Sequence, residues 1–409
     1  MVNARRLRTT EAAARLGVKP ATLYAYVSRG LLSRERSSSG STFDVIEVER
    51  LAQTARKAGG VTRGQRQMAF VTELTLIDDG HLYYRGRDAV DLAASAPFEA
   101  VAEWLWSGDW CGTDLQWEPP DAPALRSALA AVSALPPRAT ALARLSAATV
   151  ATGSGDPMRH DRSPRGVAAV GRRLIGCMVA ALGAAPAPPR PGRSVARSLA
   201  GALAGDIAGA PTSTVPDAWA TAIGGALVLM ADHEMAASTL AVRVAASVGA
   251  DPYAAVVSGL GAIGGTRHGG ASVEVHRLLA DAQREGGLAA VGARLAGYGG
   301  LPGFGMELYP EGDPRGAALI HLVRNLPAPE ERLASVESVL EAVSGRDIPP
   351  PNCDFGLAAL GYVLGLGPEA GEAVFVIART AGWLAHAAEE YTSRTSFRVR
   401  AAYTGIRPR

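Results

Sequence analysis

Residues 226–247 read ALVLMADHEMAASTLAVRVAAS, and this stretch decides the class of fold. Alanine, leucine and valine fill it, and its apolar residues recur at the three- and four-residue spacing of an α-helix. We predict one long helical stretch over 217–249 and another over 251–263, which Asp251-Pro252 opens and Gly264-Gly265 closes. A chain built from such segments is mainly helical.

Three polar residues, Asp232, His233 and Glu234, interrupt this apolar sequence. Adjacent residues of a helix point about 100° apart, so three in a row do not converge on one metal ion. We therefore interpret His233, on the residues alone, as a single imidazole satisfied within an apolar core.

Helical periodicity continues through most of the chain beyond Pro97, and short extended stretches are expected only around Gly80, within 73–93. No alternation of strands and helices predicts a parallel sheet. Residues 184–192 are too rich in proline for a helix and are expected to form an exposed connection. Further helices are predicted at 98–106, 124–135, 138–151, 271–284, 315–325, 328–344, 355–364 and 368–391.

The composition is that of a globular protein without disulfides. Of 409 residues, 48% are hydrophobic and 20% are charged. The cysteines Cys111, Cys177 and Cys353 are far apart and form no C-x-x-C pair, which argues against a disulfide framework and a zinc site. No apolar run reaches the roughly 18 residues of a membrane helix, and no apolar signal core opens the chain. We expect a cytoplasmic protein with no membrane contact, no metal and no bound cofactor.

The first 60 residues differ in charge from the rest. They carry 11 Lys+Arg and 5 Asp+Glu, a net charge of +6, whereas the whole chain has +2, so the remainder has −4. We predict that Thr10 caps a helix that ends at Gly17, and that Lys19-Pro20 starts a second one. A Ser/Gly-rich hairpin and a short helix over 44–52 follow, which is a helix-turn-helix with a small wing.

The wording T-x-E-A-A-x-x-L-G-V-x-x-x-T-L-Y-x-Y-V-x-x-G-L-L resembles the DNA-binding head of the mercury-resistance-regulator (MerR-like) family. The resemblance implies a MerR-like helix-turn-helix domain over 1–60. In that interpretation Lys19, Thr22, Tyr24 and Arg34 face phosphates or base edges of DNA. The alternative is a head kept for packing or for contacts with a protein partner.

Two stretches of the body place chemistry-bearing residues at helix starts. GGTRHGGASVEV (264–275) holds His268 between two pairs of glycines, where free N–H groups favour a neutral imidazole and a bound anion. PPPNCDFGLAALG (349–361) puts Asp354 at the start of an apolar helix, either as its N-cap or, if buried with few donors, as a base.

Arginines later in the chain indicate an anion. VFVIARTAGWLAH (374–386) buries Arg379 within an apolar helix, and SFRVRAAYTG (396–405) supplies Arg398 and Arg400. A buried guanidinium needs an anionic partner, either structural or a substrate carboxylate. Cys353 is interpreted as a small apolar neighbour of Asp354, and His276 and His386 as surface or packing residues.

Seven ordered motifs resemble the citrate synthase family over about residues 70–409. They are YYRGRDAVDLA, ALVLMADHEMAASTLAVRVAAS, RHGGA, GFG-x-x-x-Y-x-x-x-DPR, PNCDF, ART-x-GW-x-AH and FRVRAAYTG. The resemblance implies an all-α homodimer whose large domain, 63–268 with 371–409, and small domain, 269–370, close over the substrates. It also implies an acyltransferase of the tricarboxylic acid cycle type that joins an acyl-CoA, typically acetyl-CoA, to a 2-oxo acid, typically oxaloacetate.

The roles carried over with these motifs are chemically consistent. Asp354 would remove a proton from the α-carbon of the thioester, and His268 would donate a hydrogen bond to the thioester oxygen. The oxo acid would contact His233, and its carboxylates would be held by Arg315, Arg379 and Arg398, the last from the other subunit.

One position departs from the resemblance. GFGMELYPEGDPRG (303–316) has Met306 where the family signature G-F-G-H has a histidine that donates a hydrogen bond to the ketone. A thioether donates nothing, and losing one such donor typically costs about 2.7–4 kcal/mol, or 10²–10³ in rate. Glu307 would repel a dianionic substrate unless it points away or is protonated, and basic residues that often contact CoA phosphate are missing after Met306.

Three interpretations remain open. The protein is a citrate or methylcitrate synthase-type enzyme, attenuated by Met306; or Met306 marks a changed electrophile, such as a bulkier or less charged oxo acid. In the third, catalysis has lapsed, and the body senses metabolites for a DNA-binding head, as a transcriptional regulator would. Retained Asp354 and His268 argue against a full lapse of catalysis.

Overall fold

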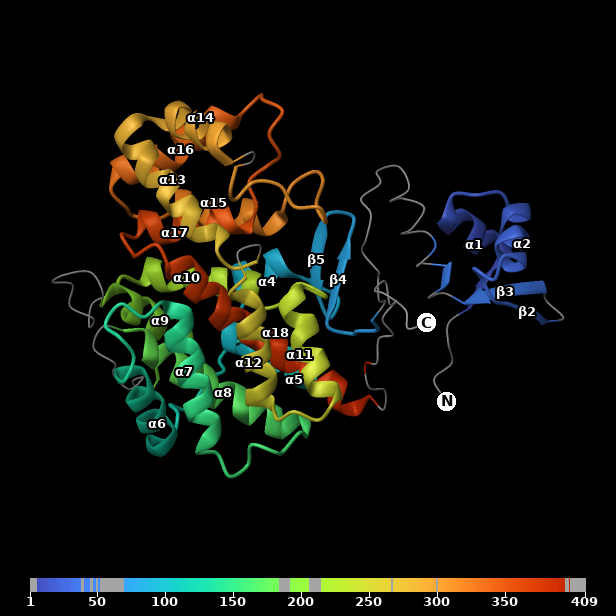
Figure 1. The fold of residues 1–409 in the computed structure, drawn as a ribbon, viewed down its shortest axis with the longest axis horizontal. Coiled ribbons are helices and arrows are strands. Elements are labelled where there is room, and N and C mark those ends of the chain that lie inside the picture. Colours follow the sequence, from blue (N-terminus) through green and yellow to red (C-terminus); the bar gives the residue numbers. More distant parts are fainter. Residues whose placement is uncertain are drawn as a thin grey trace, which may run out of the picture. The chain divides into compact units, whose positions relative to one another are not determined.

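The computed structural model describes residues 6–37, 40–44, 47–48, 51, 70–183, 192–205, 215–265, 268–298, 301–393 and 397. The chain divides into two compact units, Met1–Val71 and Thr72–Arg409 (Figure 1). We call them the head and the body and describe each by itself. The division of the body into a large and a small domain stays a prediction.

The head contains two short helices and a three-stranded antiparallel sheet. The strands β1 (Arg6–Arg8), β2 (Arg34–Ser37) and β3 (Gly40–Asp44) are ordered β1-β3-β2. The helices are α1 (Thr9–Leu16) and α2 (Pro20–Ser28). Ala12, Leu23 and Phe43 are fully buried between them. The predicted helix-turn-helix with a hairpin is therefore confirmed.

The start of α1 differs from the prediction. Arg8, not Thr10, is the N-cap, because Glu11 reaches back and its Oε2 accepts a hydrogen bond from the backbone N–H of Arg8 at 2.8 Å. The predicted end is correct, since Gly17 adopts φ 64°, a left-handed conformation suited to glycine. Of the predicted helix over 44–52, residues 47–48 and 51 are helical and most of the others lie outside the described residues.

The body is mainly helical and carries one small antiparallel sheet, β4-β5-β6, over the predicted extended stretches. Its strands are β4 (Thr75–Asp78), β5 (His81–Tyr84) and β6 (Arg87–Asp88). The helices are α4 (Ala89–Ser95), α5 (Phe98–Ser107), α6 (Ala122–Ser133), α7 (Ala141–Ser154), α8 (Pro164–Leu182), α9 (Val195–Ala204), α10 (Asp217–Met230), α11 (Ala237–Ser247), α12 (Pro252–Ile263), α13 (Ala271–Glu285), α14 (Gly287–Tyr298), α15 (Pro314–Arg324), α16 (Glu330–Val343), α17 (Cys353–Val363) and α18 (Ala370–Thr392).

The core of the body forms around α18, which contacts α5, α8, α10, α11, α12 and α17 (Figure 1). Trp383 in this helix is fully buried. Apolar periodicity predicted most of these helices to within a few residues, but the sequence analysis did not identify α4, α8, α9 and α14. The predicted connection over 184–192 lies outside the described residues except for Gly192.

The long helical stretch predicted over 217–249 is wrong, because residues 231–236 separate α10 from α11. The carbonyl groups at the end of α10 find partners on other elements. The Tyr84 hydroxyl lies 3.0–3.1 Å from the carbonyl oxygens of Val228, Leu229 and Asp232, which share its one proton, and Arg379 Nε donates to the Met230 carbonyl at 3.0 Å. These contacts replace intrahelical hydrogen bonds and end the helix, an effect that no local pattern predicts.

Within the described ranges, no helix combines the length and the apolarity that crossing a bilayer requires. Cys111, Cys177 and Cys353 are free thiols, and the latter two are buried.

Candidate active site

His233 lies in the non-helical break between α10 and α11. It is 6% exposed, and its Nε2 lies 3.0 Å from the Tyr309 hydroxyl. Burial, together with the charges of Arg315 and Arg379, holds the pKa of His233 well below its ordinary value. The next residue, Glu234, has φ 52°, an uncommon conformation for a residue with a side chain. The break therefore holds a neutral imidazole in a constrained backbone.

His268 is placed by glycine and by a serine of α11. Its Nε2 lies 2.8 Å from the Ser238 hydroxyl, to which Trp383 Nε1 also donates at 3.3 Å. A Cβ atom at Gly269 would collide with the Ile263 carbonyl, so a glycine is required beside the imidazole. Burial and the charge of Arg379 lower the pKa of His268, which keeps the ring neutral as predicted.

Arg379 is buried with one side of its guanidinium unsatisfied. It is 1% exposed, and its Nε donates to the Met230 carbonyl at 3.0 Å. Among the described residues, its Nη2 has no hydrogen-bond partner. Burial lowers the pKa of Arg379, against the opposing charge of Asp232. The arrangement suits an incoming anion.

Arg315 is also buried, but it has an internal carboxylate partner. Its Nε and Nη2 donate to the two oxygens of Asp313 at 2.9 and 2.8 Å, a bidentate pair. Asp313 is the N-cap of α15, and its Oδ2 also accepts from the backbone N–H of Cys353 at 3.1 Å. The pair fixes the guanidinium and joins α15 to the start of α17.

Asp354 is not the N-cap of α17. That position belongs to Asn352, whose Oδ1 accepts from the backbone N–H groups of Asp354 at 2.9 Å and Phe355 at 3.4 Å. The carboxyl of Asp354 is half-buried, and it has no hydrogen-bond partner among the described residues. Burial raises the pKa of Asp354 to about 6, against the opposing charge of Arg315 and with a contribution from Asp313. The N-cap role considered for Asp354 is therefore wrong, and its role as a base stays a prediction.

The loop that carries Met306 is attached to the segment before Asp354. Phe304 pairs with Pro351, and Asn352 Nδ2 donates to the Gly305 carbonyl at 2.9 Å. Gly303 and Gly305 have φ 82° and 81°, which residues with a side chain rarely adopt. Met306 itself is half-buried, and Glu307 is exposed. The repulsion expected from Glu307 is thus relieved by its exposure to solvent.

Electrostatic contacts connect these groups. The charge of Arg379 lowers the pKa of both His233 and His268, and Arg315 acts on the pKa of His233 and on that of Asp354. Three predicted site residues, His233, His268 and Asp354, are therefore grouped around Arg315 or Arg379. Arg398 and Arg400 lie outside the described residues. The partners that orient the site had no predicted role, although all of them stand within the quoted motifs, because their roles depend on contacts between distant segments; they are Ser238, Tyr309, Asp313 and Asn352.

A network of buried polar side chains begins at Asp232, within the break between α10 and α11. Asp232 is fully buried, and it accepts from Thr75 and lies 3.1 Å from His386 Nε2. His386 Nδ1 lies 3.1 Å from Arg243, which donates to Glu390 at 3.0 Å. Burial alone would raise the pKa of Asp232, but His386, Arg379 and Thr75 hold it below its ordinary value. His386 is thus buried, which agrees with one of its two predicted roles, that of a packing residue. Both of its ring nitrogens have polar partners.

The predicted DNA-facing residues of the head are accessible to different degrees. Tyr24 is 42% exposed, and the Arg34 guanidinium lies 5.5 Å from the centre of its ring. Lys19 is exposed at the N-cap of α2, and Thr22 is half-buried. Tyr24 and Arg34 thus form one cation–π pair between the second helix and the hairpin.

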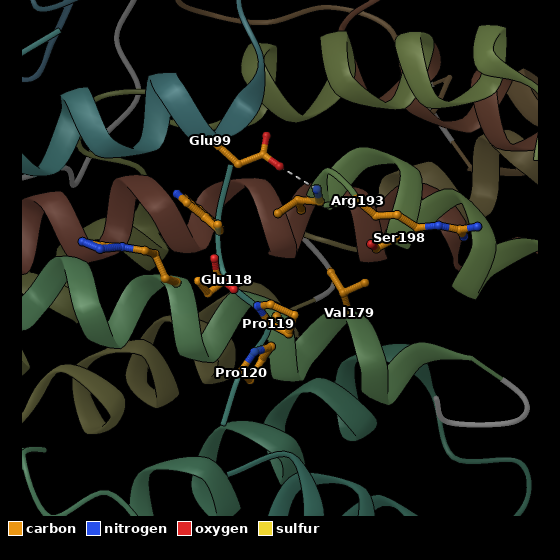
Figure 2. Close-up of a pocket in the computed structure, with 11 residues that line it drawn as sticks. Glu99, Glu118, Pro119, Pro120, Val179, Arg193 and Ser198 are labelled. Carbon is orange, nitrogen blue, oxygen red and sulfur yellow. Dashed lines mark hydrogen bonds between the residues drawn. The ribbon is translucent and has the colours of Figure 1, made fainter. Parts of the chain in front are cut away.

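A separate pocket lies between α5, α8 and α9 and the segment 117–120 (Figure 2). None of the predicted site residues lines it. Glu99 in its wall accepts from the backbone N–H of Val195 at 2.6 Å, so this carboxyl satisfies the N-terminus of α9 (Figure 2). Burial raises the pKa of Glu99. We therefore assign the carboxyl of Glu99 a structural role at the start of α9.

Comparison with known proteins agrees with this arrangement. Residues 64–409 match the family model described as citrate synthase, C-terminal domain, and residues 7–56 match the MerR HTH family regulatory protein model. Citrate synthase 2 of Bacillus subtilis (strain 168) is 33% identical over 188 residues, which span 45% of this chain and 50% of that protein. 2-Methylcitrate synthase 1 of Corynebacterium glutamicum is 27% identical over 349 residues, which span 81% of this chain and 91% of that protein.

The fold is also that of solved structures. The crystal structure of citrate synthase from Pyrobaculum aerophilum superposes with a TM-score of 0.70 at 22% identity, and the match covers 91% of this chain and 95% of that one. The structure of citrate synthase from Thermoplasma acidophilum in a ternary complex with carboxymethyl coenzyme A and oxaloacetate gives a TM-score of 0.68 at 23% identity, over 86% of this chain and 97% of that one. With a family model that matches residues 64–409, the chain belongs to the citrate synthase family.

Proposed function

We propose that the protein is a citrate synthase-type acyltransferase that condenses an acyl-CoA with a 2-oxo acid, after which water cleaves the thioester of the condensed product and releases CoA. The observation that carries the proposal is the carboxyl of Asp354. It caps no helix and has no hydrogen-bond partner among the described residues, and burial raises its pKa to about 6. A carboxylate with a pKa close to neutrality is suited to act as a general base at a carbon acid.

The neighbouring groups supply what the reaction needs. Asp354 takes a proton from the carbon next to the thioester, and the neutral imidazole of His268 donates to the thioester oxygen as negative charge develops there. The unpaired Nη2 of Arg379 binds a carboxylate of the oxo acid, with Arg315 beside it and Arg398 from a second subunit. His233 contacts the ketone. No metal or bound cofactor takes part in this scheme.

The second substrate is expected to be oxaloacetate or a close relative, because several guanidinium groups surround the site. Acetyl-CoA and propionyl-CoA are the leading acyl donors. The 2-methylcitrate synthase of Corynebacterium glutamicum makes, by its name, a product with one methyl group more than citrate, and it matches 81% of this chain. A propionyl group in place of acetyl accounts for that methyl.

The assay is release of free CoA thiol by the full-length protein from a panel of acyl-CoAs and 2-oxo acids. We expect turnover that is abolished in Asp354→Asn and retained in Glu341→Gln, a control at an exposed acid on α16. Turnover with bulkier or less charged oxo acids alone would assign Met306 to a changed electrophile. No thiol release with any pair, or equal release by Asp354→Asn, would overturn the proposal.

A homodimer is part of the proposal. Val150 on α7, Met158, Val244 on α11 and Val248 each expose an apolar side chain, and we propose that a second copy covers such residues. If Arg398 crosses the interface, mixed dimers of the inactive variants Asp354→Asn and Arg398→Ala contain one complete site. Mixing the two variants should then restore part of the activity, and no recovery would place Arg398 in its own subunit's site.

The MerR match and the exposed pair Tyr24–Arg34 favour a second candidate, a metabolite-sensing transcriptional regulator. It predicts salt-sensitive binding of the full chain to DNA from its own promoter region, altered by oxaloacetate or CoA. No shift of such DNA in a gel would count against it. In this second candidate catalysis has lapsed, and a dimeric body presents two heads to two half-sites.

A further inference from the structure

Tyr309 stands three residues after Met306, in the same turn of the loop. Its backbone N–H donates to the Met306 carbonyl at 3.0 Å. Its side chain leaves the loop and brings the hydroxyl to 3.0 Å from His233 Nε2, with the ring 2% exposed. The loop that lacks a donor at Met306 therefore reaches the break between α10 and α11 through a tyrosine.

The position of one proton decides what His233 offers a substrate. A neutral imidazole carries one N–H, so either Tyr309 donates to Nε2 or Nε2 donates to Tyr309. If Nε2 donated, the buried hydroxyl hydrogen would need another acceptor, and the described residues offer none. An unpaired buried donor costs about 1–3 kcal/mol. Donation by the Tyr309 hydroxyl avoids that cost and places the ring proton on Nδ1.

The surrounding charges are consistent with that assignment. Arg315 and Arg379, together with burial, hold the pKa of His233 well below its ordinary value, so the ring does not become doubly protonated. Burial raises the pKa of Tyr309, so the phenol keeps its proton at neutral pH. Nδ1 has no hydrogen-bond partner among the described residues, which leaves it available to a ligand.

We propose that Tyr309 is a positioning residue that fixes the Nδ1–H tautomer of His233, and that this N–H donates to the ketone oxygen in place of the donor missing at Met306. The inference rests on the proposed function and deepens it. It accounts for how a site with methionine at this position still stabilises the alkoxide that forms when the ketone is attacked. The ligand of this donor is a carbonyl oxygen next to a carboxylate.

The tautomer itself can be measured without any substrate. Nitrogen-15 spectra of the full-length protein labelled at histidine distinguish a protonated from an unprotonated ring nitrogen, and His233→Gln assigns the signals by their loss. We expect His233 to show a protonated Nδ1 and an unprotonated Nε2 that receives a hydrogen bond. A protonated Nε2 in the wild-type chain would overturn the inference, whether or not the protein is an enzyme.

Kinetics supply the second arm, on the pair of substrates that supports thiol release. Tyr309→Phe should lower kcat about 10- to 100-fold, by analogy with the partners that orient metal-ligating imidazoles, with little change in KM. In a Met306→His background the same change should cost much less, because the added imidazole restores a donor. Equal losses in both backgrounds would contradict the inference.

A matched control is Tyr391→Phe, which removes a hydroxyl bonded to the Ala250 carbonyl at 2.8 Å and should leave kcat unchanged. If Tyr309→Phe does not fold, the wild-type spectrum alone still decides the tautomer. A protein without thiol release but with the expected tautomer would refute the proposed function and leave the Tyr309–His233 relationship intact.

Discussion

Asn352 caps helix α17, in which Asp354 is the second residue, and its Oδ1 accepts from the Asp354 backbone N–H at 2.9 Å. The same amide donates through Nδ2 to the Gly305 carbonyl at 2.9 Å. One side chain therefore holds the start of α17 and the Met306 loop together, and it leaves the carboxyl of Asp354 without a structural task. Asn352 thus has the structural role at this helix start, and the carboxyl of Asp354 is available for catalysis.

Replacing Asp354 by asparagine should remove activity and leave the fold in place. A general base contributes about 10²–10⁴ in rate, so kcat should fall by at least that range. Because the carboxyl has no described partner and its charged form is disfavoured by burial, the melting temperature should hold or rise. In Asn352→Ala, loss of the cap should instead cost about 0.5–2 kcal/mol of stability. Urea unfolding of both variants compares their stabilities. If Asp354 had a structural role, Asp354→Asn would be the less stable of the two.

The pH dependence of kcat/KM should have an acid limb near pH 6. Burial raises the pKa of Asp354 to about 6, and the base works only when ionised, so the rate rises with pH and levels off above that value. The stability effect has the opposite sign. A raised carboxyl pKa means that the folded state holds the proton more tightly, so this group's contribution to stability falls as pH rises from its unfolded value of 3.8 to about 6. Asp354→Asn should abolish that part of the fall in urea-measured stability.

Met306→His should increase the rate with oxaloacetate. The imidazole restores a hydrogen-bond donor at the ketone, which is worth about 10²–10³ in rate where such donors have been removed. Glu307 is exposed and does not oppose the change. Steady-state kinetics of the variant, with Met306→Leu as the size-matched control, provide the measurement. A rate that stays level or drops would show that the missing donor is not what limits the reaction.

The network behind His233 predicts a large effect on stability. Arg243 donates to Glu390 at 3.0 Å, and Glu390 is 3% exposed, so Arg243→Met leaves a buried carboxylate without its guanidinium. Breaking such a pair costs about 3–5 kcal/mol. Arg324→Met, at the exposed pair with Glu337, should cost about 0–1 kcal/mol. Denaturant titrations of the two variants measure this difference in the free energy of unfolding. Equal losses in the two variants would contradict the prediction.

The head can be tested apart from catalysis. Arg34→Ala in the full chain removes the cation over Tyr24, so DNA affinity should fall and the dependence of log affinity on log salt should weaken by about one unit if Arg34 contacts a phosphate. Arg126→Ala, at an exposed position of α6 in the body, serves as the control. Fluorescence anisotropy across a salt series measures both slopes, and identical curves would remove Arg34 from the interface.

Apolar periodicity predicted most helices of this chain because a helix that faces a core repeats its apolar residues at a fixed spacing. It failed at residues 231–236, where the alanine-rich segments on both sides favour one continuous helix. The Tyr84 hydroxyl and Arg379 Nε, from distant segments, take the carbonyls that would have continued α10. A pattern within one segment contains no information about such partners.

The residues of the site also fall into those that local sequence makes conspicuous and those whose roles depend on distant segments. His268, Asp354 and Arg379 were identified because glycine, proline and an apolar helix make a polar residue conspicuous in sequence. Tyr309 and Asn352 stand within the quoted motifs but had no predicted role, because a tyrosine in a loop and an asparagine before a helix are common, and their contacts join segments far apart. The N-cap role considered for Asp354 was wrong for a related reason, since Asn and Asp compete equally for that position.

The central claim is that Asp354 removes a proton from the carbon next to a thioester. Exchange of that proton in D₂O measures the step directly. A 2-hydroxy dicarboxylic acid is added to occupy the place of the oxo acid beside Arg315 and Arg379, because it has the carboxylates but offers no ketone to attack. Mass spectrometry of the recovered acetyl-CoA or propionyl-CoA should show deuterium at the α-carbon with the wild-type protein and none above background with Asp354→Asn. Equal incorporation by both proteins, or none by the wild type with either thioester, would contradict the account.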